Sequence, residues 1–220
     1  MSGQPQAISL QGVSRSYGRE HILNNISLDV SQGRFVVLRG GNGTGKTTLL
    51  RVIATRLRLT GGRGQVFGFD LAKQAHEVRR RTVLVTVGGG VYPMLSAREN
   101  LELSATLYGV DVDSAALLDR VGLADAGSKL VRSFSSGMKK RLSLARLLLP
   151  GSALWLLDEP YSTLDDDGRS LVDELVGEAG RQGITVLMAT HEDLRPGSRQ
   201  PDAELRIAAG ALTLERSAAQ

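Results

Sequence analysis

The stretch Gly40-Gly-Asn-Gly-Thr-Gly-Lys-Thr47 decides which fold this sequence predicts. It matches the phosphate-loop pattern G-x-x-x-x-G-K-[ST] without a gap. The apolar run before it, residues 34–39, has the composition of a buried strand, and residues 48–56 after it have the pattern of a helix. Glycines let the backbone curl so that several N–H groups point at one anion, and the following helix adds its positive dipole end. The stretch therefore predicts a binding site for nucleotide phosphates.

Individual roles within this loop follow from the pattern. Lys46 is expected to reach the β- and γ-phosphates and to act in catalysis, and the Thr47 hydroxyl is expected to bind Mg²⁺. The residues expected around the phosphates are Gly40, Gly41, Asn42, Gly43, Thr44, Gly45, Lys46, Thr47 and Thr48. The alternative is a plain glycine-rich turn, which the flanking strand and helix make the less favoured interpretation.

Length and composition are those of a globular chain. Its 220 residues, 41% of them hydrophobic, suffice for one large domain or two small lobes. A net charge of +4 permits binding to polyanions or to a negatively charged membrane face without requiring either. The sequence has no cysteine, its first residues lack an apolar signal core, and no apolar run is long enough to span a bilayer. These features predict a cytosolic protein.

The order of predicted elements indicates an α/β core that is interrupted by helices. The predicted strands are at 7–13, 22–30, 34–39, 81–87, 153–158, 184–189, 203–207 and 211–214, and the predicted helices are at 48–56, 100–108, 114–121 and 138–149, with a further helix after the strand 153–158 that runs on to about 179. Ser96 and Glu99 match a capping box before the helix at 100–108. We therefore expect a single domain over residues 1–220, with a core lobe formed by 1–87 and 151–220 and a helical lobe over 88–150.

A second candidate element is Ala153-Leu-Trp-Leu-Leu-Asp-Glu-Pro160, an apolar strand that ends in two acids. Because ligands in open α/β folds bind at the carboxyl edge of the sheet, Asp158 is expected to hold Mg²⁺ beside the phosphate loop. Glu159 is expected to take the proton of an attacking water. A strand that merely ends in an acidic turn is the alternative, but a triphosphate site needs a magnesium carboxylate as well as a phosphate cradle.

A third candidate element is Phe134-Ser-Ser-Gly-Met138, at the start of a basic amphipathic helix. Ser135 and Ser136 are typical helix caps, and the same geometry also suits an anion. This stretch resembles the Leu-Ser-Gly-Gly-Gln signature of ATP-binding cassette (ABC) ATPases, and it lies about 20 residues before Asp158, as in that family. Ser135 and Gly137, the pair that contacts phosphate in the family, are retained.

The basic run after the signature, Lys139, Lys140 and Arg141, has a simpler interpretation. It is typical of a solvated helix face, and it gives only weak support for binding to nucleic acid.

The resemblance extends over nearly the whole chain. Tyr17 matches the aromatic residue that stacks on adenine, with an exposed turn tyrosine as the alternative. Residues 162–165 look like the family's D-loop, which touches a partner subunit, and His191 resembles the switch histidine that contacts the γ-phosphate. The resemblance implies a P-loop NTPase (RecA-like) core with an N-terminal antiparallel β-subdomain and an inserted helical subdomain. It also implies binding of ATP and Mg²⁺, and ATP hydrolysis with Glu159, His191 and Lys46 as catalytic residues.

The sequence departs from the family at the junction of the core and the helical lobe. The family normally has a glutamine there, and Val87 or Gly88 stands in its place. Neither residue offers the hydrogen-bonding side chain of glutamine, although the glycine run at 88–90 supplies a hinge.

The resemblance further implies a head-to-tail dimer. The phosphate loop, Asp158, Glu159 and His191 of one subunit then face Ser135 and Gly137 of a second cassette, which is an identical chain or a close homologue. Such a chain works with integral membrane permease subunits and is peripheral on the cytoplasmic face of the cell membrane.

Several members of the family fit this description. The short chain and residues 154–165 look most like the ATPase subunit of haem exporters used in cytochrome c maturation, and ABC-2 type or multidrug exporters fit nearly as well. Soluble ABC ATPases that act on nucleic acid or ribosomes typically carry tandem cassettes or coiled-coil insertions, which this sequence lacks, so no nucleic acid partner is expected. A small-molecule kinase would leave Ser135, Gly137 and His191 without a role.

Overall fold

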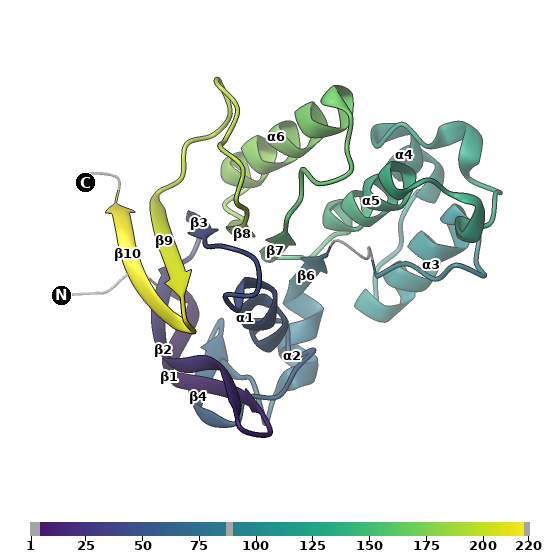
Figure 1. Ribbon diagram of the computed structural model, residues 1–220. Coiled ribbons are helices and arrows are strands. Elements are labelled where there is room, and N and C mark those ends of the chain that lie inside the picture. The colour runs from purple at the N-terminus through teal and green to yellow at the C-terminus, as the bar shows by residue number, and fades with distance from the viewer. Residues whose placement is uncertain (1–4, 87–89, 218–220) are drawn as a thin grey trace.

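The computed structural model describes residues 5–86 and 90–217, and its centre is a six-stranded sheet in the order β10-β9-β3-β8-β7-β6 (Figure 1). Strands β9, β3, β8, β7 and β6 are parallel, and β10 pairs antiparallel with β9. The strands are β3 (Phe35–Arg39), β6 (Thr82–Val85), β7 (Leu154–Asp158), β8 (Thr185–Ala189), β9 (Ala203–Ala208) and β10 (Ala211–Ser217). This arrangement brings the ends of β3, β7 and β8 to one edge of the sheet.

Successive side chains of the central strands pack alternately into two separate hydrophobic cores. In β7, Leu154 and Leu156 pack into one core, and Trp155 and Leu157 pack into the other. All five residues of β7 are buried, because both faces of the sheet are covered. A continuous apolar strand is therefore what this position requires.

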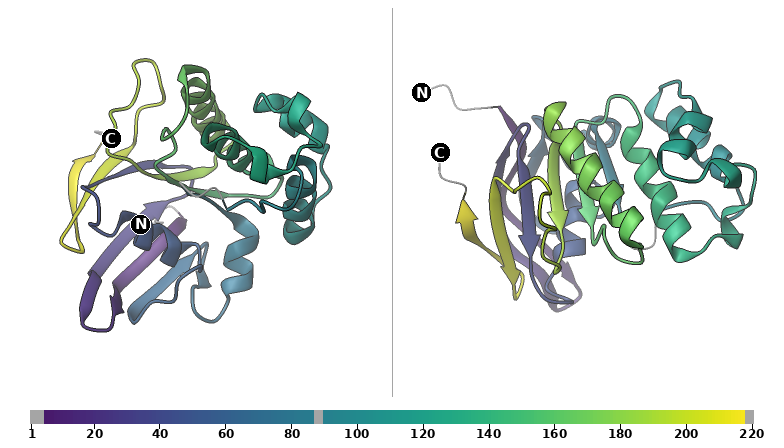
Figure 2. Two further views of the ribbon diagram at one scale, coloured as in Figure 1. Left: turned by 45° about the vertical axis from the view of Figure 1, so that its right-hand side comes forward. Right: turned by 90° about the horizontal axis from the view of Figure 1, so that it is seen from above.

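One face of the sheet is covered by helix α1 (Lys46–Ile53) and by a second sheet in the order β2-β1-β4-β5. The strands of that antiparallel sheet are β1 (Gln6–Tyr17), β2 (Glu20–Ser31), β4 (Gly61–Val66) and β5 (Phe69–Asp70), and the short helix α2 (Ala75–Arg81) follows them. In the left view of Figure 2, α1 and this sheet lie below the central strands. The predicted antiparallel β-subdomain is thus present, and β1 and β2 form one long hairpin.

The other face is covered by α5 (Ser136–Ala145) and α6 (Asp166–Arg181), which lie above the central strands in the left view of Figure 2. Between β6 and β7 the chain forms α3 (Ala97–Tyr108), α4 (Ser114–Arg120), three short 3₁₀ turns and α5. These helices extend the molecule to one side of the sheet, as the right view of Figure 2 shows. The exact division into a core lobe and a helical lobe stays a prediction, and part of the junction, residues 87–89, lies outside the described residues.

Helix ends depart from the sequence prediction where side chains bind the backbone. Helix α5 begins at Ser136 instead of Met138, because Ser135 caps it with a hydroxyl that accepts a hydrogen bond from the Met138 N–H at 3.2 Å. Its α-helical part ends at Ala145, and a 3₁₀ turn follows. The Ser152 hydroxyl lies 3.3 Å from the carbonyl oxygens of Leu147 and Leu149 in that turn. Helix α1 ends at Ile53, shortly before Thr55, whose φ of 54° is left-handed.

The predicted capping box at the start of α3 is present. The Ser96 hydroxyl accepts from the Glu99 N–H at 3.2 Å, and the Glu99 carboxylate accepts from the Ser96 N–H at 2.7 Å. Among the helices of residues 5–86 and 90–217, none is both long enough and apolar enough to cross a bilayer.

We expect Ser96→Ala to lower the free energy of unfolding by about 1 kcal/mol, because it removes the hydroxyl that accepts from the Glu99 N–H and donates to the Glu99 carboxylate at a buried helix start. Thermal or urea unfolding followed by circular dichroism measures the change. Ser128→Ala, an exposed serine of the same segment, is the control and should leave the midpoint unchanged. Equal midpoints for the two variants would show that the box contributes nothing.

Candidate functional site

The loop between β3 and α1 leaves the start of α1 open to a ligand. Gly45, the residue before the helix, has a left-handed φ of 106° and makes no side-chain cap. The first amides of a helix have no intrahelical acceptor, so those of α1 are available to an anion. Gly40 is required by a close approach, since a Cβ there would lie 2.6 Å from the carbonyl oxygen of Ile207. The predicted phosphate cradle is therefore built into the backbone.

The side chains of this loop are already ordered around it. The Lys46 ammonium is almost fully buried and donates to the carbonyl oxygens of Gly40 and Gly41 at 2.7 and 3.0 Å. The Thr44 hydroxyl donates to the Gly41 carbonyl at 3.0 Å. Lys46 is thus held over the loop by weak neutral acceptors, which a phosphate oxygen would outcompete.

Thr47 and Asp158 meet at the edge of the sheet. The Thr47 hydroxyl lies 3.0 and 2.8 Å from the two carboxylate oxygens of Asp158. Burial raises the pKa of Asp158, and the hydrogen bond from Thr47 opposes that shift. Among residues 5–86 and 90–217, no group of three or more histidine, cysteine or acidic residues could hold a metal ion alone. A hydroxyl and one carboxylate fit Mg²⁺, which commonly completes its shell with phosphate oxygens and waters.

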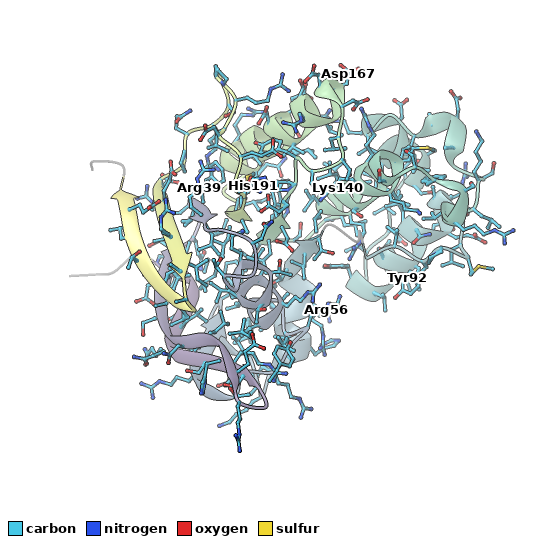
Figure 3. All side chains as sticks on the ribbon, in the orientation of Figure 1. Arg39, Arg56, Tyr92, Lys140, Asp167 and His191 are labelled. Carbon is cyan, nitrogen blue, oxygen red and sulfur yellow. The ribbon has the colours of Figure 1, made fainter. Side chains whose placement is uncertain are left out.

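The Glu159 carboxylate lies between the side chains of Lys46 and His191. One carboxylate oxygen is 3.6 Å from the Lys46 ammonium nitrogen, and the other is 3.0 Å from Nδ1 of His191. The Glu159 side chain is 15% exposed, whereas that of His191 is 60% exposed. The three predicted catalytic residues thus lie together, at the start of α1, at the end of β7 and in the loop after β8, where Figure 3 labels His191.

The backbone of Glu159 is strained. Its φ of 47° is left-handed, which costs a non-glycine residue about 1 kcal/mol or more. Its N–H donates to the Ala189 carbonyl at 2.8 Å. Its carbonyl oxygen accepts from the N–H and the hydroxyl of Ser162, at 3.2 and 2.7 Å, and from the ammonium of Lys140 at 2.9 Å. These bonds hold the backbone of Glu159 at the sheet edge.

The loop after His191 is anchored on both sides. A guanidinium nitrogen of Arg39 donates to the Glu192 carbonyl, and Nε of Arg39 lies 3.1 Å from the Glu204 carboxylate. The Glu192 carboxylate in turn lies 2.7 Å from the guanidinium of Arg169 in α6. The chain is thus held immediately after His191, while the imidazole itself remains accessible.

Tyr17 lies at the rim of a depression of about 510 Å³ that runs along the phosphate loop. Its ring is half exposed, and the Arg15 guanidinium carbon lies 4.4 Å from the ring centroid. The residues lining the depression are Tyr17, Glu20, Ile22, Gly41, Asn42, Gly43, Thr44, Gly45, Lys46, Thr47, Thr48, Asp158 and Glu159. A larger open hollow of about 870 Å³ lies between α6 and the loop around Arg195, and it contains none of the predicted site residues.

The signature residues do not line this depression. Ser135 caps α5, and a Cβ on Gly137 would lie 3.1 Å from the carbonyl oxygen of Thr163, in the stretch that resembles the D-loop. The structure therefore places Gly137 beside residues 162–165, and neither Ser135 nor Gly137 lines the depression along the phosphate loop of the same chain. The predicted junction residues Val87 and Gly88 lie outside the described residues.

Lys140 contacts the backbone of Glu159, which the sequence does not predict. The interpretation of Lys139, Lys140 and Arg141 as a solvated helix face is wrong for Lys140, which is 1% exposed. Arg141 is also engaged, because its guanidinium lies 2.7 Å from the Asp165 carboxylate. The available signal was the helical period, since α5 buries Lys140 on the same side as Leu144.

The sequence profile described as ABC transporter matches residues 23–162. The chain is 39% identical over 189 residues to the daunorubicin resistance ATP-binding protein DrrA3 of Streptomyces coeruleorubidus, a match covering 84% of this chain and 60% of that protein. It is 37% identical over 191 residues to the cytochrome c biogenesis ATP-binding export protein CcmA of Xanthomonas oryzae pv. oryzae, covering 85% and 87% of the two. The chain thus spans about 60% of the length of the drug-resistance relatives it matches first.

A solved structure has the same fold. It is a dimeric, post-hydrolysis state of an ATP-binding cassette bound to ADP and inorganic phosphate. The TM-score is 0.84 at 22% sequence identity, and the match covers 96% of this chain and 97% of that one. This likeness confirms the predicted P-loop fold class.

We expect Thr47→Val to weaken Mg–ATP binding by about 10-fold, because it removes the hydroxyl that we expect to bind Mg²⁺ and that is bonded to Asp158. Titration calorimetry with ATP, in the presence of Mg²⁺ and then of EDTA, measures the effect. The loss should be confined to the Mg²⁺ series. Thr106→Val, on the exposed face of α3, is the control. An equal loss of affinity in EDTA would exclude a role for Thr47 at the metal.

Proposed function

The chain belongs to the ABC transporter family, and on that basis we propose that it binds ATP with Mg²⁺ and hydrolyses it as the ATP-binding subunit of a transporter. The observation that carries this proposal is the position of the Glu159 carboxylate, between the Lys46 ammonium and the His191 imidazole beside an uncapped helix start. Such an arrangement suits the removal of a proton from a water that attacks a phosphoryl group.

Binding of the nucleotide follows from the depression along the loop. The open amides of α1 and the Lys46 ammonium bind the phosphates, and the exposed ring of Tyr17 stacks on the adenine. Thr47 and Asp158 hold Mg²⁺, which supplies neutralisation of the charge on the triphosphate oxygens when it is bound. Burial of Asp158 strengthens that interaction, because a buried carboxylate gains more from a nearby cation than an exposed one does.

Hydrolysis follows from Glu159. The carboxylate accepts a proton from the water whose oxygen forms the new bond to the γ-phosphorus, and the bond from that phosphorus to the β–γ bridging oxygen breaks. The products are ADP and inorganic phosphate. His191 orients the carboxylate through its Nδ1 and offers its opposite ring nitrogen to the γ-phosphate. Lys46 stabilises the negative charge that accumulates on the leaving oxygen.

A second cassette completes the site. Neither Ser135 nor Gly137 lines the depression along the phosphate loop of its own chain, which supports a site in which a copy of this chain or a close homologue supplies them across an interface. The γ-phosphate then holds the pair closed, and hydrolysis releases it. The dimeric state of the structural neighbour supports this arrangement.

Integral membrane permease subunits are the proposed partners, with this chain on the cytoplasmic face of the cell membrane. Among transporter classes we favour a haem-exporter type that serves cytochrome c biogenesis, since the match covers 87% of the relative with that name. A drug exporter is the second candidate, supported by the 39% identity to the daunorubicin resistance protein. Action on nucleic acid is disfavoured, because Lys140 is buried and Arg141 is paired with Asp165.

Replacing Glu159 with glutamine tests hydrolysis. We expect Glu159→Gln to bind Mg–ATP with unchanged affinity and to lose about 100-fold or more in turnover, because the amide does not accept the proton. The variant should also accumulate as an ATP-bound dimer in light-scattering chromatography. Glu174→Gln on α6, outside the depression, is the matched control. Turnover at the wild-type rate would exclude Glu159 as the base.

Two experiments test the transporter class, namely copurification in detergent and deletion of this chain in the cell. Purification together with the membrane proteins encoded beside this chain should yield a stable complex, and RNA in place of those proteins would contradict the assignment. Deletion of the chain should abolish covalent haem staining of c-type cytochromes without changing anthracycline resistance. The opposite pattern would select the drug exporter.

A further inference from the structure

Lys140 is a buried cation to which the proposed reaction gives no role. It belongs to α5, is 1% exposed, and its ammonium donates to the backbone carbonyl oxygen of Glu159 at 2.9 Å. Figure 3 shows Lys140 where α5 meets the end of β7, on the side of the sheet opposite to α1. The contact therefore joins the helix of the signature to the residue proposed as base.

Burying this ammonium carries a cost that an apolar residue would avoid. Burial lowers the pKa of Lys140 to about 8, while the carboxylates of Asp158 and Glu159 act in the opposite direction. Packing alone does not require this charge, because an apolar side chain of similar volume would fill the same space without the desolvation cost. Here the charge lies behind the carboxyl edge of the sheet, next to the acids of the site.

The bond that Lys140 makes is directed at the strained residue itself. Glu159 keeps its left-handed backbone, with φ of 47°, only while its surroundings hold it there. Ser162 binds the same carbonyl, but it belongs to the same turn and moves with it. The Lys140 ammonium comes from a different element, so among the donors that the described residues offer to this carbonyl it is the one that ties the orientation of Glu159 to α5.

We propose that Lys140 is a positioning residue for hydrolysis, which holds the backbone of Glu159 against α5 and thereby aims its carboxylate at the attacking water. The proposal rests on the proposed function, because it needs Glu159 as the base. About one and a half turns of α5 separate Lys140 from Ser135. The same rigid helix therefore carries the phosphate-contacting pair at its start and the anchor of the chain's own base further along.

Lys140→Met tests the proposal in the full chain. Methionine fills a similar volume, and Ser162 keeps the Glu159 carbonyl hydrogen-bonded, so the variant should fold. We expect kcat to fall about 10- to 100-fold, the effect of a slightly misplaced catalytic group, while KM and the Kd for Mg–ATP change by less than about 2-fold. Lys140→Arg, which keeps the charge and the donor, should recover part of kcat. Lys129→Met, exposed on the surface, is the matched control.

A double-mutant cycle separates positioning from a general effect on the fold. In the Glu159→Gln background, Lys140→Met should lower the residual kcat by less than about 2-fold, because that variant lacks the carboxylate whose position Lys140 is proposed to fix. Lys140→Gln, with a donor of shorter reach and no charge, replaces methionine in both backgrounds if Lys140→Met lowers the thermal midpoint.

Two results would overturn the proposal. One is a wild-type kcat in Lys140→Met, and the other is the same fold-loss in both backgrounds. Neither coincides with failure of the proposed function, which would appear as wild-type turnover in Glu159→Gln alone.

Discussion

The hydrogen bonds between the Thr47 hydroxyl and the Asp158 carboxylate join two parts of the chain that are 111 residues apart in the sequence. These bonds form only if β3, the strand before α1, and β7, the strand that ends at Asp158, reach the same edge of the sheet. A single strand, β8, lies between them. The apolar runs of β3 and β7 meet that requirement, because both strands are buried on both faces. The same meeting point brings Lys46 and Glu159, the sequence neighbours of Thr47 and Asp158, to within 3.6 Å of each other.

Positive and negative charges are concentrated around that point at an energetic cost. Lys46, Asp158 and Lys140 are each less than one-tenth exposed, and Glu159 carries a left-handed backbone in addition. An apolar cluster of the same volume would stabilise the fold more. The arrangement is better explained as a preorganised site for a highly charged ligand. The phosphates and the cation of that ligand would compensate the buried charges of Lys46 and Asp158.

The sequence predicts those parts of the structure that depend on local rules. The phosphate loop, the strand that ends at Asp158 and the capping box of Ser96 each combine a short pattern with a short-range physical cause, and all are present. Strands β4 and β5 and helix α2 were missed, because Gly61-Gly-Arg-Gly lacks alternation and a seven-residue helix gives little periodicity. Lys140 was misread, since its burial depends on the end of β7, which is distant in the sequence.

The helical segment containing α3, α4 and α5 enters from β6, the outermost strand on one side of the sheet, and returns into β7. The phosphate-loop strand β3 lies further in, shielded by β8 and β7. Lengthening or recasting the outer face of this segment leaves the hydrogen bonding of β3 untouched, provided that the buried side of α5 is kept. In evolution, the outer surface of this helical segment, and with it the partners that the chain binds, can therefore change while the nucleotide site stays the same.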